Sequence, residues 1–391
     1  MREYLKCLKC IFLMVCLYTV LLMLIFLIPD KGIQVHRDEA IGYINKVGYY
    51  PNIFFDSSSA KMDNLTDEVM LQITQPGAEN PLISAMVPGY ARYWHGYLVF
   101  LRPLLLIFDY FQIRFLGYFL STMLLAILFG LLLKHSGWGV SIAFVASTVM
   151  VRFTVVPESL QFSSCFNIMM ISSVWLLNKL DKVSAEELHL AVPFAIVGSV
   201  VNFVDFLTAP LITLGIPLII YISEKIKANA GLWKTHVLDV FQLSFCWGLG
   251  YGITWILKWF CATLFLKENI FADAYKAILF RVEDNREYQV NRILTIGKNI
   301  FYIMGSDGIK VLFPVLALLI IVLFIMIWKT GKKALALLPL MLIACIPYVW
   351  YFILANHSWI HGYFTYRVQI VTLFAGGVML CFLWGWRRER R

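Results

Sequence analysis

Residues 5–28 read LKCLKCIFLMVCLYTVLLMLIFLI, an apolar run that Lys6 and Lys9 interrupt only at its start. A helix of about 20 such residues crosses the hydrocarbon core of a bilayer. A secretory signal peptide has a shorter apolar core and a small-residue cleavage site after it. Here Pro29-Asp30-Lys31 follows instead. We therefore expect residues 5–28 to form an uncleaved first membrane span.

The composition of the 391-residue chain also indicates a protein that is surrounded by lipid. Hydrophobic residues make up 60% of the chain, charged residues 15%, and the mean hydropathy is +0.75. Soluble domains carry roughly 25% charged residues. In hydrocarbon only helices or closed barrels satisfy the backbone, and continuous rather than alternating apolar runs favour helices. The expected fold is all-α: a polytopic transmembrane helix bundle forming one integral membrane domain over residues 1–391.

The formal net charge of +9 comes largely from Lys and Arg in short segments beside apolar runs. Residues in such places orient a membrane protein, with the more basic loops in the cytoplasm. We therefore expect membrane lipids and no nucleic acid as partners. The sequence also holds no glycine-rich phosphate-binding motif, which argues against a cytosolic nucleotide site.

The apolar runs predict about ten spans. They cover residues 5–28, 115–133, 139–155, 160–177, 190–206, 208–222, 237–264, 309–328, 334–354 and 368–384. If these spans alternate in direction, the basic segments 134–135, 179–182, 224–227, 329–333 and 387–391 all fall on one side. The positive-inside rule makes that side the cytoplasm and places both termini there.

Two long segments then lie outside the membrane, residues 30–114 and 267–308. Residues 97–108 are apolar but hold Arg102-Pro103 at their centre, and counting them as a span would put most later basic loops outside. We expect this stretch to be an amphipathic helix that lies on the outer leaflet or dips into it. A connector between spans is usually a few residues long, so the first extracytoplasmic loop is expected to be a folded, functional element.

The first loop carries the main catalytic candidates. Asp63 and Asp67 are four residues apart, so a helix would place both carboxylates on one face, where they can accept a proton, hold a metal or bind sugar hydroxyls. The alternative is that Asp63 or Thr66 caps the helix. Asp38 and Glu39 are further candidates close after the first span, with a solvated helix start as the alternative interpretation.

Charged residues at the membrane edge form a second group of candidates, because charge there is costly and usually functional. Glu158 is a catalytic candidate that can instead pair with Arg152. Asp205 precedes Thr208-Ala209-Pro210 and is either a substrate ligand or a turn-forming residue. Lys258 lies about two turns below the outer end of its helix, where it either binds a lipid phosphate or snorkels toward the headgroups.

The last outer loop, NHSWIHGYFTYR over residues 356–367, is the most specific stretch of the chain. His357, His361 and Arg367 beside aromatic rings suit a phosphate headgroup and a stacked sugar. Arg92 and His95 in the first loop are candidates for the same role. The loop itself lacks enough zinc ligands, so a divalent metal is possible but unsupported and no cofactor is expected. The eight cysteines include one CxxC pair, a weak metal or redox signal.

This layout resembles the GT-C superfamily of membrane glycosyltransferases. The motifs DNLTD (63–67), RYWHGY (92–97) and residues 356–367 also resemble an uncharacterised bacterial group placed near these enzymes. The resemblance implies an acidic base in the first outer loop, at Asp38 or Asp63, and an assisting acid at Glu158. It implies a lipid-phosphate ligand at Arg367, His361 or Lys258.

The expected function is transfer of a sugar from a polyprenyl-phosphate-linked donor to an envelope glycan, lipid or protein on the outer face of a bacterial plasma membrane. A carboxylate would deprotonate the acceptor hydroxyl while Arg and His stabilise the leaving phosphate. A polysaccharide polymerase or ligase is the alternative, although such enzymes usually use a large later loop. A lipid or glycan flippase is less well supported, because the chain shows few midplane charges and no repeat.

Overall fold

The computed structural model describes residues 2–54, 57–282, 290–303, 328 and 331–388. Within these ranges the regular structure is helical, and an isolated bridge between Asn52 and Lys61 is the nearest approach to a strand. The all-α class is therefore confirmed for this part of the chain.

The described helices follow one another along the chain. They are α1 (Arg2–Ile25), α2 (Asp30–Val47), α3 (Asn64–Gln72), α4 (Pro81–Met86), α5 (Leu98–Ile107), α6 (Tyr110–Met150), α7 (Leu160–Leu180), α8 (Ala191–Val204), α9 (Ile212–Ala228), α10 (Trp233–Leu266), α11 (Ile270–Val282), α13 (Leu338–Ile353), α14 (Ala355–Ile360), α15 (Gly362–Thr365) and α16 (Ile370–Arg388). Short 3₁₀ turns join several of them, and residues 292–303 are also helical.

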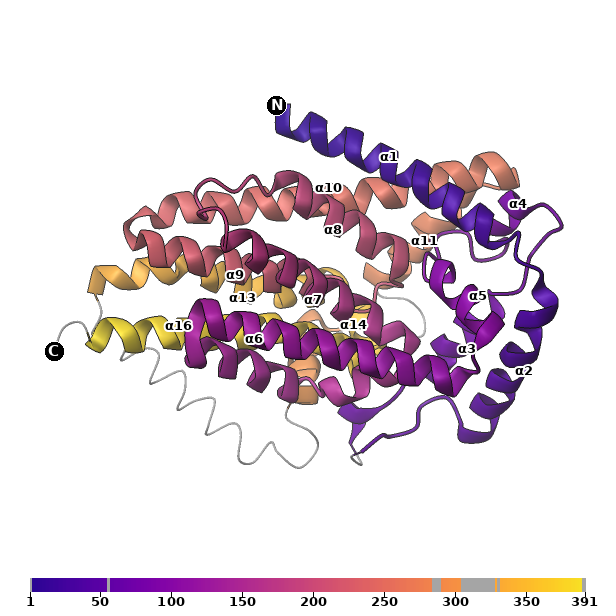
Figure 1. Ribbon diagram of the computed structural model, residues 1–391, viewed down its shortest axis with the longest axis horizontal. Helices are drawn as coiled ribbons and strands as arrows, with labels where there is room; N and C mark the ends of the chain where they lie inside the picture. Colours follow the sequence, from indigo (N-terminus) through magenta and orange to yellow (C-terminus); the bar gives the residue numbers. More distant parts are fainter. Residues whose placement is uncertain (1, 55–56, 283–289, 304–327, 329–330, 389–391) are drawn as a thin grey trace.

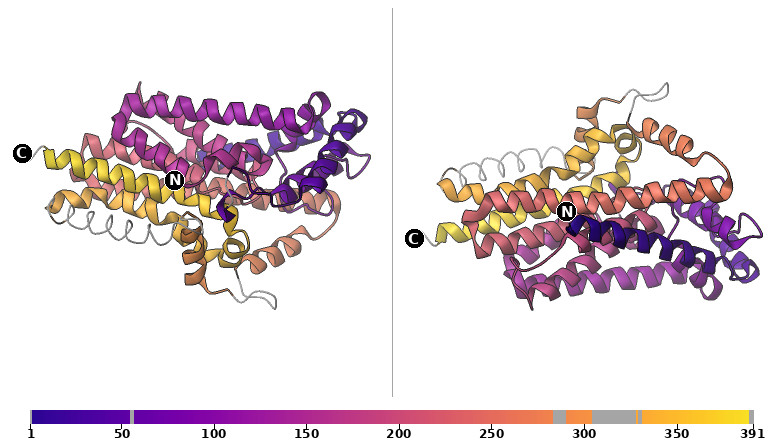
Figure 2. Two further views of the ribbon diagram at one scale, coloured as in Figure 1. Left: turned by 90° about the horizontal axis from the view of Figure 1, so that it is seen from below. Right: turned by 90° about the horizontal axis from the view of Figure 1, so that it is seen from above.

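The long helices lie side by side as a bundle, and α2 to α5 gather at one end with α11 beside them (Figures 1 and 2). The C-terminus lies at the opposite end (Figure 1). Helix α6 is two arms joined at Gly137, whose φ of +76° breaks the helix. Glycine adopts this backbone conformation without steric cost, so Ser136-Gly137-Trp138 forms the tight reversal between predicted spans 115–133 and 139–155.

Six helices in the described residues are long and apolar enough to cross a membrane. They are Arg2–Ile25, Tyr110–Met150, Leu160–Leu180, Ala230–Leu266, Ala334–Ile353 and Gly362–Trp386. Many apolar side chains on their outer faces are exposed, as lipid contact requires, and the protein is a helical membrane protein.

The predicted count of ten is not reached by these criteria. Helices α8 and α9 have 14 and 17 residues, short of a typical span. The predicted span 309–328 lies outside the described residues except for Trp328. The ten-span count therefore stays a prediction.

Helix α5 shows why residues 97–108 differ from the spans. Arg102 is fully buried and donates hydrogen bonds to the backbone carbonyls of Ile25, Ile28 and Thr74. It also lies 3.4 Å from the carboxylate of Asp30, which pairs with Arg37 on α2. These contacts tie the end of α1, the start of α2 and the end of α3 to a ten-residue helix. The structure is thus helical over Leu98–Ile107, while the place of this helix at the membrane stays a prediction.

Candidate functional site

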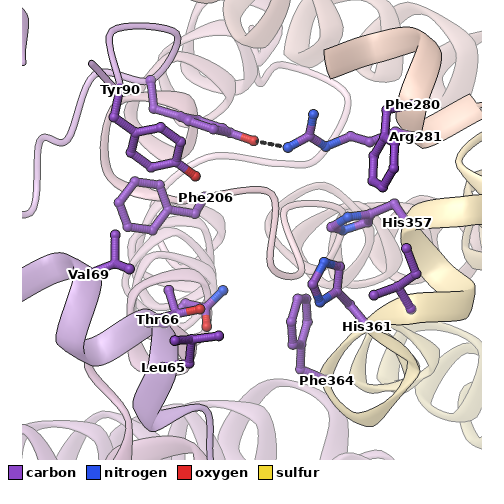
Figure 3. Close-up of a pocket in the computed structure, with 13 residues that line it drawn as sticks. Leu65, Thr66, Val69, Tyr90, Phe206, Phe280, Arg281, His357, His361 and Phe364 are labelled. Carbon is purple, nitrogen blue, oxygen red and sulfur yellow. Dashed lines mark hydrogen bonds between the residues drawn. The ribbon is translucent and has the colours of Figure 1, made fainter. Parts of the chain in front are cut away.

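A cavity of about 200 Å³ opens where the short helices meet the bundle (Figure 3). Its walls come from α3, the segment before α5, the first turn of α7, the α8–α9 connection, the end of α11, and the α14–α15 loop. We call it the polar cavity. It is lined by Leu65, Thr66, Val69, Tyr90, Tyr93, Gln161, Phe206, Phe280, Arg281, His357, Ile360, His361 and Phe364.

Arg281 is the cation of the polar cavity. Its guanidinium donates to the hydroxyl of Tyr93 at 2.8 Å, drawn dashed in Figure 3, and to the carbonyl of Ala277 at 2.8 Å. The buried Nε of Arg281 has no hydrogen-bond partner. Arg281 was not among the sequence-based candidates. The sequence feature that could have identified Arg281 is its position as the last basic residue of the amphipathic run that forms α11.

His357 and His361 face the cavity from the same side as Arg281 (Figure 3). Their ring centroids are 4.9 Å apart. The Nε2 of His357 lies 3.0 Å from the carbonyl oxygen of Leu207, and His361 stacks on Phe364. Burial lowers the pKa of His361 to about 4 and that of His357 well below its ordinary value, so both imidazoles are neutral at pH 7.

Aromatic rings cover the opposite part of the cavity. Tyr90 and Tyr93 pack on Phe206 with centroids 6.2 Å and 5.5 Å away. Tyr90 and Phe206 lie across the cavity from the two histidines in Figure 3. Such faces pair well with the apolar side of a sugar ring, while the phenol hydroxyls can bind its polar groups.

No Asp or Glu is among the residues that line this cavity. Asp63 accepts hydrogen bonds from the N–H and hydroxyl of Thr66, at 3.1 and 2.8 Å, and from the hydroxyl of Tyr363 at 3.0 Å. It therefore caps α3 directly behind a lining residue, Thr66. Burial raises the pKa of Asp63 above its ordinary value.

Asp67 points the other way, to the start of α7. Its carboxylate accepts from the hydroxyls of Tyr110 and Ser159 and from the N–H groups of Leu160 and Gln161. The residue is fully buried, which raises its pKa to about 6, while the hydrogen bond from Tyr110 opposes that rise. A negative charge at a helix N-terminus is stabilised by the unpaired N–H groups there.

The remaining predicted acids lie apart from the cavity lining. Glu158 pairs with Arg114. The side chain of Asp38 is 60% exposed and lies 3.6 Å from Arg37. Asp205 accepts from the N–H of Thr208 at 2.8 Å, which is the geometry of a turn.

Arg92 and His95 support the wall that carries Tyr90 and Tyr93. Arg92 pairs with Asp273 of α11 at 3.2 Å and stacks on Tyr90. The Nε2 of His95 lies 2.9 Å from the carbonyl of Tyr90. Burial lowers the pKa of His95 to about 3, so its ring is neutral.

Lys258 and Arg367 are also buried away from the cavity. Lys258 donates to the carbonyl of Met86, at the end of α4, and lies over the ring of Trp94. Arg367 donates to the carbonyls of Tyr363 and Ser59 and lies 4.5 Å from the ring of Phe162. The structure therefore brings His357 and His361 together at the cavity and places Arg367 behind it.

Metal ligands do not converge in the described residues: no group of three His, Cys, Asp or Glu side chains could hold an ion. All eight cysteines are free thiols.

A second cavity of about 490 Å³ lies between α5, α6, α7 and α8. We call it the apolar groove. Most of its lining is hydrophobic and includes Tyr97, Phe100, Leu104, Leu116, Leu120, Ile168, Ile171, Val200 and Val204, and its polar members are Ser163, Ser164 and Asn167. Neighbouring residues of α3 and α7 line different cavities. Val69 and Gln161 line the polar cavity, whereas Met70 and Leu160 line the apolar groove.

Comparison with known proteins adds no assignment to this geometry: no protein-family model, curated protein or solved structure matches the chain.

Proposed function

We propose that this protein is a membrane glycosyltransferase that moves a sugar from a polyprenyl-phosphate-linked donor to an envelope glycan, lipid or protein. The observation that carries the proposal is the adjacency of the polar cavity and the apolar groove. A wall formed by α3 and the first turn of α7 separates them. A substrate with an anionic head and a long apolar tail suits such a pair of spaces.

The head of the donor would occupy the polar cavity. Arg281 offers a guanidinium to a phosphate, and charge-assisted hydrogen bonds of this kind are strong when partly shielded from water. Tyr90, Tyr93 and Phe206 offer ring faces for the sugar. The hydroxyl of Thr66 and the amide of Gln161 offer polar contacts to its hydroxyl groups.

The tail would lie in the apolar groove. Phe100, Leu116 and Leu120 line this groove and are also exposed on the outer faces of their helices. A tail that lies in the bilayer is already in hydrocarbon, so the groove adds no water-to-apolar transfer free energy. It would hold the tail by van der Waals packing while the phosphate stays in the polar cavity.

In the proposed reaction a carboxylate takes the proton of the acceptor hydroxyl, and the oxygen forms a bond to the anomeric carbon. The bond from that carbon to the phosphate oxygen breaks, and the lipid phosphate leaves with the electron pair beside Arg281. Asp63 is the candidate base, because it contacts the lining residue Thr66 and its raised pKa suits proton transfer.

The proposal includes a GT-C-like architecture with about ten spans. The end that carries α2 to α5 would face the outside of a bacterial plasma membrane, with both termini in the cytoplasm. The basic segments at 179–182 and 224–227 support this orientation.

One observation favours a second candidate, a ligase or polymerase that uses diphosphate-linked glycans. The polar cavity is lined by Arg281, His357 and His361 and by no carboxylate. An arginine and imidazoles can bind a diphosphate and accept a proton without an acidic residue.

Mass spectrometry of lipid-linked and envelope glycans from a host deleted for this protein tests the proposal. The deletion is complemented at matched expression with wild type, Arg281→Gln, Asp63→Asn or the exposed control Glu79→Gln. We expect the deletion to lose one sugar, wild type and Glu79→Gln to restore it, and the other two variants to fail.

Accumulation of complete lipid-linked repeat units in the deletion, without loss of a sugar, would instead support the ligase or polymerase. Identical glycans in all strains would refute both candidates. Normal glycans with Asp63→Asn alone would remove Asp63 as the base and leave the donor site in place.

A further inference from the structure

The charge inside the polar cavity is low for a phosphate site. Among the described residues that line it, Arg281 is the single Lys or Arg, and none is an acid. The other described lining residues are apolar, phenols, neutral amides or hydroxyls, or the two histidines. This described lining therefore supplies one fixed positive charge.

Several charged groups on the surrounding elements have partners of their own. Asp63, behind α3, is bonded to Thr66 and Tyr363. Arg92 is paired with Asp273 of α11, and Lys298 donates to the carbonyl of Trp359. These groups do not line the cavity, so they leave the count at one positive charge.

The two imidazoles do not add charge at neutral pH. A carbonyl oxygen only accepts hydrogen bonds, so the Nε2 of His357, 3.0 Å from the carbonyl of Leu207, carries the proton. The Nδ1 of a neutral His357 is then a lone pair. The buried Nδ1 of His361 has no hydrogen-bond partner to stabilise a second proton. Burial and the nearby Arg281 both lower the pKa of His361.

A bound anion with one charge is balanced by Arg281, whereas a second negative charge would be buried without a counterion. Such a charge is costly unless a neighbouring group becomes protonated. An imidazole with an anion at close range is the group in the cavity that can do so.

We infer that His357 and His361 determine specificity by charge: the cavity accepts a singly charged phosphodiester as it stands, and a doubly charged diphosphate only together with one proton. This inference rests on the proposed function, since it concerns the head group of the same donor. His361, whose ring centroid is 4.9 Å from that of His357 and whose Nδ1 has no partner, is the imidazole that takes the proton.

The test uses two soluble probes whose own charges do not change between pH 5.5 and 8. One is methyl citronellyl phosphate, with one negative charge, and the other is citronellyl methyl diphosphate, with two. Binding of each to the full-length protein in lipid nanodiscs is measured by isothermal titration calorimetry across this pH range.

We expect the affinity for the phosphodiester to change by less than about threefold. The affinity for the diphosphate should rise as pH falls, approaching about tenfold per pH unit, because binding takes up one proton. Proton uptake should also appear as a dependence of the binding heat on the ionisation enthalpy of the buffer, for the diphosphate alone.

Variants assign the effect to residues. His361→Asn should abolish the pH dependence and leave phosphodiester binding within about threefold, while Arg281→Gln should weaken both probes at least tenfold. The exposed Glu79→Gln is the control and should behave as wild type. The comparison of two probes on the wild-type protein decides the matter even if a variant fails to fold.

Diphosphate binding that is as tight as phosphodiester binding at pH 8 and independent of pH would overturn the charge-selection inference but keep the anion site. Absence of binding by both probes would refute the anion site itself, and with it the donor site of the proposed function. Full pH dependence in His361→Asn would overturn the assignment of the proton to His361.

Discussion

Asp63 and Asp67 are four residues apart on one short helix, yet their carboxylates have different surroundings. Asp63 faces Thr66 and Tyr363, next to the polar cavity. Asp67 faces three donors at the start of α7 and the hydroxyl of Tyr110 on α6. At the scale of single residues, one carboxylate lies next to the polar cavity and the other joins three helices.

Asp67→Asn should therefore lower stability strongly. The carboxylate has two oxygens for four donors, whereas an amide has one oxygen and turns an NH₂ group toward donors that then lack a partner. We expect a loss of about 3 kcal/mol in the free energy of unfolding. Thermal unfolding in detergent measures it, with the exposed Asp38→Asn as control. Equal melting temperatures for both variants would contradict this role of Asp67.

At the scale of elements, α8 and α10 pack unusually closely. A Cβ atom placed on Gly250 would lie 1.9 Å from the carbonyl oxygen of Ala195, and one on Gly198 would lie 2.1 Å from the carbonyl oxygen of Trp247. Small residues at such a crossing let two helix backbones approach within a membrane. This contact positions the α8–α9 connection, which contributes Phe206 to the cavity.

Gly250→Ala should separate α8 from α10, because the clash is with backbone and cannot be relieved by a side-chain rotation. We expect a clear fall in melting temperature and in yield of folded protein. Gly252, two residues further on the same helix, has no atom within 4 Å of the corresponding Cβ position. Gly252→Ala is therefore the matched control and should be neutral or stabilising by up to about 1 kcal/mol. A neutral Gly250→Ala would argue against the close packing.

At the scale of the whole molecule, buried neutral histidines make stability depend on pH. The pKa of His95 is lowered to about 3 and that of His361 to about 4, from an ordinary value of 6.5. At a pH below 6.5 but above these lowered pKa values, the two imidazoles bind protons in the unfolded chain and not in the folded chain. Stability is therefore full above pH 6.5 and falls as pH drops, by about 1.4 kcal/mol per pH unit for each imidazole.

Asp67 and Asp63 act in the opposite direction in acid, because folding raises the pKa of both carboxyls. These two carboxyls oppose three imidazoles of lowered pKa, those of His95, His357 and His361, so a net loss of stability in acid remains. Melting temperatures from pH 7.5 to 4.5 measure it. His95→Asn and His361→Asn should each flatten the curve, while the exposed His189→Asn should not. A flat wild-type curve would show that the imidazoles are not buried in neutral form.

The orientation in the membrane is a second prediction at this scale. We expect single cysteines introduced into a cysteine-free variant at exposed residues 182 and 227 to react with impermeant maleimide only after the cells are opened. A cysteine at exposed residue 79, in the loop that the proposal places outside the cell, should react in intact cells. Labelling on the opposite sides would reverse the proposed topology.

The features of the structure that the sequence predicted correctly are those that depend on local patterns. Apolar runs of spanning length set the helices, because a backbone in hydrocarbon has to satisfy its own hydrogen bonds. The spacing of His357 and His361 placed both on adjoining turns, and the pair does line the cavity. Arg102-Pro103 also marked α5 as distinct from the spans. Each of these inferences needs only neighbours within a few residues.

The composition of the polar cavity was decided by contacts between distant segments. Arg281 reaches Tyr93 across 188 positions, and Asp67 binds the start of α7 more than 90 positions away. Nothing in the spacing of charges distinguishes these residues from Arg367 or Asp63. Local sequence therefore specified helices, membrane character and the histidine pair, whereas only tertiary packing selected which charges face the cavity, because that choice depends on which helix faces meet.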